Sequence, residues 1–121
     1  MPTVLLIEDD ARFRPSCRLA LERGGYRVVE AGDGLGGARA YRESPADVVV
    51  LDVFLPRLGG LGGLDALCQL RRLDPAARVV VISAGGEGPL GEALALGAAT
   101  ALHKPFGLSE LLDAVKRALA R

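Results

Sequence analysis

Neither sign of charge dominates this sequence, which carries 15 acidic and 15 basic residues among 121. A balanced charge gives no electrostatic footprint for nucleic acid or for an anionic membrane. No apolar run approaches the roughly 20 residues that a membrane-spanning helix needs. The N-terminus also lacks the layout of a signal peptide ahead of its first apolar run. We therefore expect a cytoplasmic domain that binds neither nucleic acid nor a membrane.

Cysteine is also scarce, since only Cys17 and Cys68 occur. Both fall in helical patterns, where a cysteine usually behaves as a small buried hydrophobe. Two free thiols fit a reducing compartment, although a disulfide between them stays an open alternative. A chain of 121 residues is long enough to bury its own core without such a bridge. We expect one domain over residues 1–121.

Short apolar runs alternate with helical patterns along the chain. The runs are continuous rather than alternating, which is typical of strands covered on both faces and therefore of a parallel sheet. Five such strand–helix units predict a doubly wound α/β domain. The expected strands lie at residues 4–7, 28–29, 48–51, 79–82 and 99–103.

The segments between these runs have apolar residues at helical spacing. The first predicts an inward stripe of Phe13, Cys17, Ala20, Leu21 and Gly24, the third one of Leu64, Leu67, Cys68 and Leu70, and the last one of Leu108, Leu111, Leu112, Val115 and Leu119.

Chemically active side chains stand where four of the expected strands end. Glu8 and Asp9 follow the first strand, Asp52 the third, Ser83 the fourth and Lys104 the fifth. In a doubly wound sheet, ligands bind at the carboxyl ends of the strands. We therefore expect three carboxylates, a hydroxyl and an ammonium to meet at one edge of the sheet.

These groups suit reversible phosphoryl transfer to a carboxylate. Three carboxylates disfavour one another's ionised form unless a cation compensates them, and Mg²⁺ prefers a few carboxylates together with waters and a phosphate. One carboxylate can then act as the nucleophile toward phosphorus. A lysine neutralises the phosphoryl oxygens and a serine hydroxyl donates a hydrogen bond to them.

Each residue alone has a simpler explanation. Acidic residues before a helix are favoured by the helix dipole, and Asp10 is expected to do no more than cap. Asp52 alone fits a turn, Ser83 alone a loop hydroxyl, and Lys104 alone a solvated surface charge. Their joint occurrence at four strand ends favours the functional interpretation.

The sequence resembles the receiver domains of two-component response regulators, including those of chemotaxis type. The similarity covers nearly the whole chain. It implies a flavodoxin-like three-layer fold whose five parallel strands are ordered 2-1-3-4-5. The motifs that carry it are the acidic opening at 5–10, the phosphoacceptor strand at 47–56, the hydroxyl-bearing strand end at 81–84, the Gly-Ala at 97–98 and the segment at 103–106 that holds Lys-Pro-Phe.

The resemblance implies a Mg²⁺ site. Asp52 is the expected phosphoacceptor and a metal ligand. Asp9 is expected to bind the metal directly and Glu8 through a water. The backbone carbonyl of Phe54 completes the set of protein ligands.

The resemblance also implies how the phosphoryl group is handled. Lys104 is expected to pair with it and Ser83 to hydrogen-bond it, with a cis peptide bond between Lys104 and Pro105. The donor would be a phosphohistidine on a histidine kinase or a phosphotransfer protein. The chain would not be an enzyme in the usual sense, although it assists its own phosphorylation.

Four features depart from the family pattern. Ala101 stands where the family usually carries an aromatic residue that reports the phosphorylated state. The loop after Pro56 is about three residues longer, so that the family's glycine matches Gly63. The segment at 85–89 is short and rich in glycine and proline, which predicts a loosely held fourth helix. The residues that often tune dephosphorylation are Phe54 and Gly85, and neither side chain can hydrogen-bond a water, which predicts slow self-dephosphorylation.

The sequence leaves one rival function open and disfavours two others. A receiver-like module that binds partners without phosphorylation is favoured by Ala101 and by the glycine-rich region of the fourth helix. A metal-dependent phosphohydrolase would need an acid or base where Phe54 stands. A flavin-binding domain would need a phosphate loop where the acidic cluster stands.

Partners are expected on the face formed by the fourth helix, the fifth strand and the fifth helix, where a homodimer could also form. The cognate kinase and the presence of an output domain stay open. The residues considered for this face are Leu90, Leu94, Ala101, His103 and those near Lys116.

Overall fold

The computed structural model describes residues 1–53, 62–84 and 87–120. Strands and helices alternate along the chain, as the apolar runs predict. The strands are β1 (Thr3–Ile7), β2 (Arg27–Ala31), β3 (Val48–Asp52), β4 (Val79–Ser83) and β5 (Thr100–His103), and the helices are α1 (Phe13–Arg23), α2 (Gly34–Glu43), α3 (Gly63–Leu73), α4 (Glu87–Ala95) and α5 (Leu108–Leu119).

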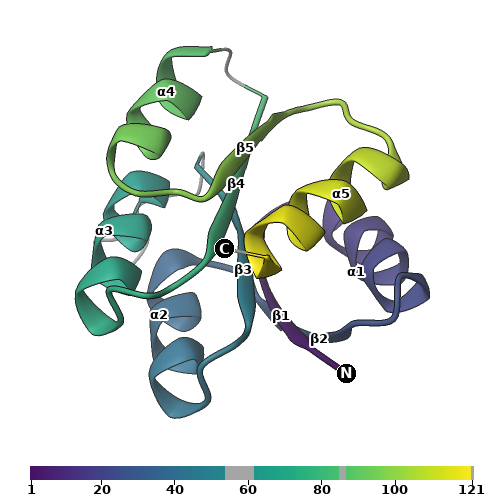
Figure 1. Cartoon of the computed structure of the whole chain (residues 1–121), viewed down its shortest axis with the longest axis horizontal. Helices are drawn as coiled ribbons and strands as arrows, with labels where there is room; N and C mark the ends of the chain where they lie inside the picture. The colour runs from purple at the N-terminus through teal and green to yellow at the C-terminus, as the bar shows by residue number, and fades with distance from the viewer. Residues whose placement is uncertain (54–61, 85–86, 121) are drawn as a thin grey trace.

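The five strands form one parallel sheet in the order β2-β1-β3-β4-β5. Helices α1 and α5 cover one face of the sheet, and α2, α3 and α4 cover the other (Figure 1). The expected three-layer, flavodoxin-like fold is therefore confirmed. The strand order reverses between β1 and β3, which is the switch point where ligands bind in such sheets.

Both faces of each central strand are buried, which explains why the apolar runs are continuous. Leu5, Ile7, Val49 and Leu51 join the core under α2, α3 and α4. Their neighbours Val4, Leu6, Val48 and Val50 join the core under α1 and α5. Because side chains alternate between the faces of a strand, two buried faces require an unbroken run.

Some expected helix stripes are wrong in detail. Leu108 is 47% exposed and lies on the rim of a groove between α1 and α5 rather than over the sheet. The sequence stripe also missed Ala114 and Ala118, which are buried because small side chains let α5 approach the strands closely. Gly24 follows the end of α1 and is exposed.

The two cysteines decide an alternative that the sequence left open. Both thiols are free, so the alternative of a disulfide is excluded; Cys17 is buried as expected, whereas Cys68 is only half-buried. Burial raises the pKa of the Cys17 thiol to about 12.

Among the helices that the structure describes, none is long and apolar enough to cross a membrane.

Candidate functional site

The register of the sheet brings the chosen residues to one edge. Ile7 pairs with Leu51, so Glu8 and Asp52 are the next residues along adjacent strands. Across the following pairs, Asp52 lies level with Ile82, and Ser83 level with His103. Glu8 and Asp52 therefore share one level of the sheet, Ser83 lies one residue beyond it and Lys104 two residues beyond it, so the strand ends converge at one edge as expected.

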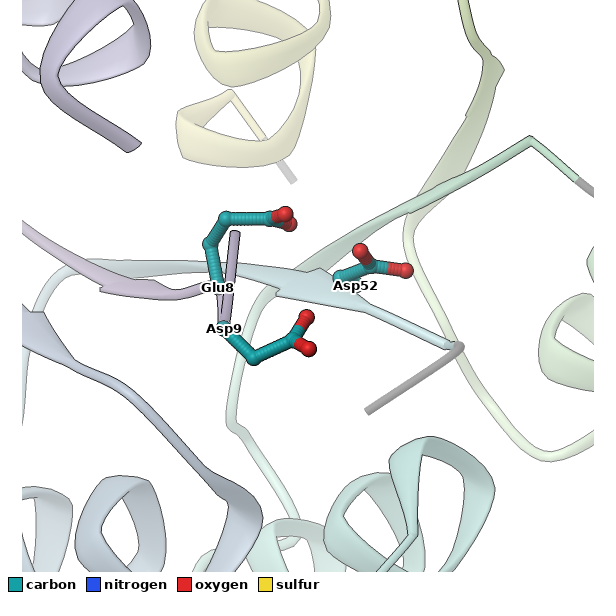
Figure 2. A group of neighbouring side chains, drawn as sticks. All are labelled: Glu8, Asp9 and Asp52. Carbon is teal, nitrogen blue, oxygen red and sulfur yellow. The ribbon is translucent and has the colours of Figure 1, made fainter. Parts of the chain in front are cut away.

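Three carboxylates gather at this edge (Figure 2). Oxygen atoms of Glu8, Asp9 and Asp52 all lie within 4.8 Å of one another. Glu8 is fully buried and Asp52 is 4% exposed, whereas Asp9 is exposed. This donor set consists of hard oxygen ligands with an opening toward solvent, which fits a hydrated Mg²⁺ ion.

Lys104 lies among these carboxylates rather than in solvent. Its Nζ lies 3.1 Å from Asp52 Oδ2, and 3.3 and 3.5 Å from the two carboxylate oxygens of Glu8. Only 17% of its side chain is exposed. The simpler explanation, a solvated surface lysine, is therefore wrong. One ammonium does not compensate three carboxylates, so the edge favours a further cation.

The electrostatics of the site show the same imbalance. Burial raises the pKa of Glu8 to about 8, and the hydrogen bond and negative charge of Asp52 add to this effect, while Lys104 opposes it. Burial lowers the pKa of Lys104, but the hydrogen bonds and charges of Asp52 and Glu8 outweigh it and raise that pKa overall.

Ser83 ends β4 and is fully buried, so it is not a loop hydroxyl. Its backbone carbonyl accepts a hydrogen bond of 2.8 Å from the backbone N–H of Lys104. This bond continues the β4–β5 pairing by one residue and fixes where the Lys104 side chain begins.

Asp10 makes the backbone hydrogen bonds expected of a capping residue, although the N-cap position of α1 is Arg12. Its Oδ1 accepts hydrogen bonds from the backbone N–H groups of Arg12 (2.8 Å) and Phe13 (3.3 Å). These two bonds lower the pKa of the Asp10 carboxyl. The backbone N–H of Asp10 in turn donates to Glu8 Oε1 at 3.3 Å, so the turn that begins α1 also fixes the buried carboxylate.

Two residues near the site were missed by sequence reasoning. The ring centroid of Phe13 lies 4.2 Å from Lys104 Nζ, whereas helical spacing placed Phe13 only on an inward helix stripe. Arg14 Nη1 donates to the backbone carbonyl of Glu8 at 2.9 Å. Their place in the sequence could have pointed to both residues, because the first turn of a helix that follows β1 lies beside the same edge of the sheet.

Several expectations concern the loops around the site. The Lys104–Pro105 peptide bond is cis, as expected. A Cβ atom on Gly63 would lie 2.2 Å from the carbonyl oxygen of Val53, so only glycine fits there, in agreement with the matching of Gly63 to the family's glycine. The expectations for Phe54 and Gly85, and for residues 58–61 of the glycine-rich insertion at 58–63, fall on residues outside those that the structure describes.

The expected partner face is partly corrected. Leu94 is 48% exposed, and His103 and Lys116 are exposed, but Leu90 is buried against the core under α4. Ala101 is half-buried and packs against the same core, where its methyl group leaves no ring to move.

Comparison with known proteins gives one family. The model of the response regulator receiver domain matches residues 4–116. The chemotaxis protein CheY of Listeria monocytogenes is 37% identical over 117 residues, which cover 94% of this chain and 96% of CheY. The transcriptional activator protein PfeR of Pseudomonas aeruginosa is 40% identical over 121 residues, which cover 99% of this chain but 38% of PfeR.

The other comparisons agree. The transcriptional regulatory protein KdpE of Mycobacterium tuberculosis is 36% identical over 121 residues, and this chain spans 52% of its length. The chain thus spans about half or less of the transcriptional regulators and nearly all of CheY. A receiver domain protein from Clostridium thermocellum has a similar structure, with a TM-score of 0.92 at 27% identity, over 100% of this chain and 96% of that one.

Proposed function

Because this chain belongs to the response regulator receiver domain family, we propose that it accepts a phosphoryl group on Asp52 from a phosphohistidine donor, in a reaction that depends on Mg²⁺. The observation that carries this proposal is the environment of Asp52. Its buried carboxylate lies between two further carboxylates and an ammonium group 3.1 Å away. We infer one receiver domain over residues 1–121.

The carboxylates would hold the metal. Asp9 and Asp52 would bind Mg²⁺ directly and Glu8 through a water, with the backbone carbonyl of Phe54, which lies outside the described residues, as a further ligand. When bound, the ion supplies positive charge that neutralises the carboxylates and the phosphoryl oxygens. Receiver domains typically bind Mg²⁺ at such an acidic pocket.

The transfer itself needs a nucleophile, a leaving group and charge compensation. An oxygen of Asp52 attacks the phosphorus, the new P–O bond forms, and the P–N bond to the donor imidazole breaks. The imidazole leaves with the bonding electron pair and takes up a proton. Lys104 exchanges its hydrogen bond with Asp52 for one with a phosphoryl oxygen, and Ser83 donates to another.

Hydrolysis of the phosphoryl group on Asp52 by water should be slow. Phe54 and Gly85 occupy the positions that often tune dephosphorylation, and neither side chain can orient an attacking water by a hydrogen bond. The chain would therefore hold its phosphoryl group for longer than a fast chemotaxis-type receiver does.

Receiver domains are signalling modules that interact with histidine kinases and effector domains. For this chain we propose a histidine kinase or phosphotransfer protein as donor, a protein effector as target, and the cytoplasm as its location. Contacts would use the exposed parts of α4, β5 and α5, including Leu94, His103 and Lys116, where a homodimer could also form. No nucleic acid or membrane contact is proposed for this domain.

Ala101 favours one alternative. A half-buried methyl group on β5 offers no aromatic side chain whose rotation could report phosphorylation to this face. A receiver-like module that binds its partner independently of phosphorylation is therefore the second candidate function.

Incubation with Mg²⁺ and acetyl phosphate separates the two. We expect the intact mass to increase by one phosphoryl group, only with Mg²⁺, and not in Asp52→Asn. If the folded protein gains no phosphoryl group from acetyl phosphate or from a phosphohistidine donor, the phosphorylation-independent module is favoured instead.

A further inference from the structure

The ring of Phe13 and the ammonium of Lys104 are in direct contact, with 4.2 Å between Nζ and the ring centroid. We propose that Phe13 is a positioning residue, whose ring face holds the Lys104 ammonium where it reaches Asp52 and an incoming phosphoryl group. The inference rests on the proposed function for its consequence, but the contact itself is independent of it.

The ring is held from two sides. Phe13 is the first residue of α1, and its backbone N–H donates to Asp10 Oδ1. Its ring packs edge-to-face against Phe106, with 5.7 Å between centroids and an angle of 85° between planes. Phe106 lies two residues after Lys104, so the segment that supplies the ammonium also fixes the ring on which the ammonium rests.

Lys104 needs such support because its stem is long and flexible. Ordering a lysine side chain costs rotamer freedom, and an ammonium is a compact point charge without the fixed geometry of a guanidinium. Asp52 and Glu8 attract Lys104 Nζ. The negative face of an aromatic ring attracts a cation as well, and more strongly where water is excluded, as it largely is around this 17% exposed side chain.

A rival explanation is that Phe13 is only a packing residue. Its ring does pack against the core under α1 and α5. Packing would be retained by a leucine of similar hydrophobicity, whereas the attraction for a cation would be lost. The rate of phosphorylation by acetyl phosphate in Mg²⁺ distinguishes these roles, provided that each variant is shown to be folded by urea unfolding.

We expect Phe13→Leu to lower the maximal rate of phosphorylation by roughly three- to tenfold. Phe13→Tyr and Phe13→Trp should restore most of that rate because they keep the ring. Fluorinated phenylalanines at position 13, which weaken the negative ring face at nearly constant size, should lower the rate stepwise. In a Lys104→Met background, Phe13→Leu should have no further effect. Leu119→Ala, in the same core but at the C-terminal end of α5, controls for general destabilisation.

A second readout does not depend on phosphorylation. Ring currents of Phe13 should shift the NMR signals of the protons near Lys104 Nζ, and Phe13→Leu should remove the shift. Equal rates for Phe13→Leu and wild type, an unchanged Phe13→Leu effect in Lys104→Met, or the absence of the ring-current shift would overturn the inference. If wild type is not phosphorylated at all, the proposed function fails, and the NMR shift alone decides whether Phe13 positions Lys104.

Discussion

The ammonium of Lys104 lies 3.1 Å from Asp52 Oδ2, although β4 separates the strands from which the two residues project. The contact exists because parallel strands end at one edge of the sheet and because Lys104 continues the pairing of β5 with Ser83. It ties the expected nucleophile to the expected charge-compensating group before any phosphoryl group arrives.

The buried Glu8 should make stability depend on pH. Its pKa in the fold is raised to about 8, above the ordinary value of 4.5, so the folded state binds the proton more tightly than the unfolded state. This contribution is fully present below about pH 4.5 and is lost as the pH rises toward 8. With a metal chelator present, we expect the free energy of unfolding, measured by urea titration, to fall between about pH 4.5 and pH 8.

Glu8→Gln supplies the matched control, since its amide does not titrate. Its stability should vary less with pH over the same window, and Mg²⁺ should stabilise wild type more at the alkaline end, where Glu8 is ionised. If, with a metal chelator present, wild type became more stable from pH 5 to pH 8 and Glu8→Gln did not, the raised pKa of Glu8 would be contradicted.

Gly63 should not tolerate a side chain. A Cβ atom there would overlap the backbone of Val53, whose carbonyl oxygen would be 2.2 Å away, and backbone cannot move aside cheaply. We expect Gly63→Ala to destabilise the fold by about 1–3 kcal/mol, the usual cost of overpacking, measured as a lower urea midpoint. A neutral effect would show that the approach of α3 to the end of β3 is looser than described.

Gly91 should behave in the opposite way. It lies inside α4 and is exposed, and a Cβ atom there would meet no atom within 4 Å outside its own helix. We expect Gly91→Ala to stabilise the protein by about 1 kcal/mol, because alanine has the higher helix propensity. Slower amide hydrogen exchange in α4 should accompany this gain if the helix is loosely held, as its sequence predicts; unchanged exchange would argue against that.

Tyr41 links α2 to the end of α3, since its hydroxyl donates to Asp74 Oδ2 at 2.7 Å. This bond, together with one from the backbone N–H of Ala76, lowers the pKa of Asp74. Its contribution is therefore present above the ordinary pKa of an aspartate and is lost as the pH falls through the lowered one. We expect Tyr41→Phe to lower the urea midpoint at neutral pH.

The difference in urea midpoint between wild type and Tyr41→Phe tests this link. It should shrink on acidification below the ordinary aspartate range, while Asp74→Asn should remove most of the pH dependence of this difference. A Tyr41→Phe effect of constant size at every pH would show that ring packing, rather than the hydrogen bond, accounts for the loss.

The fold was predictable because burial on two faces leaves a direct mark on sequence. The runs at 48–51 and 79–82 are fully buried and were clear, and they became β3 and β4. The edge strand β2 was weaker in sequence for a physical reason. Val28 is buried, but Val29 is 40% exposed, so this strand needs fewer apolar residues.

The convergence of Glu8, Asp52, Ser83 and Lys104 at one edge was predictable for a related reason, since topology alone brings the strand ends together. What could not be predicted depends on the tilt of helices and the choice of rotamers. The contact of Phe13 with Lys104, the exposure of Leu108 and the burial of Leu90 all depend on how α1, α5 and α4 lie on the sheet. Helical spacing fixes a face of each helix but not its distance from its neighbours.

The central claim is that the carboxylate of Asp52 carries the phosphoryl group, and borohydride reduction tests it most directly. Reduction converts an aspartyl phosphate to homoserine, which peptide mass spectrometry locates within the chain. After incubation with Mg²⁺ and acetyl phosphate, we expect homoserine at position 52 and at no other aspartate. Incorporated phosphate that leaves position 52 unreduced, or that maps to Asp9 or His103, would contradict the account.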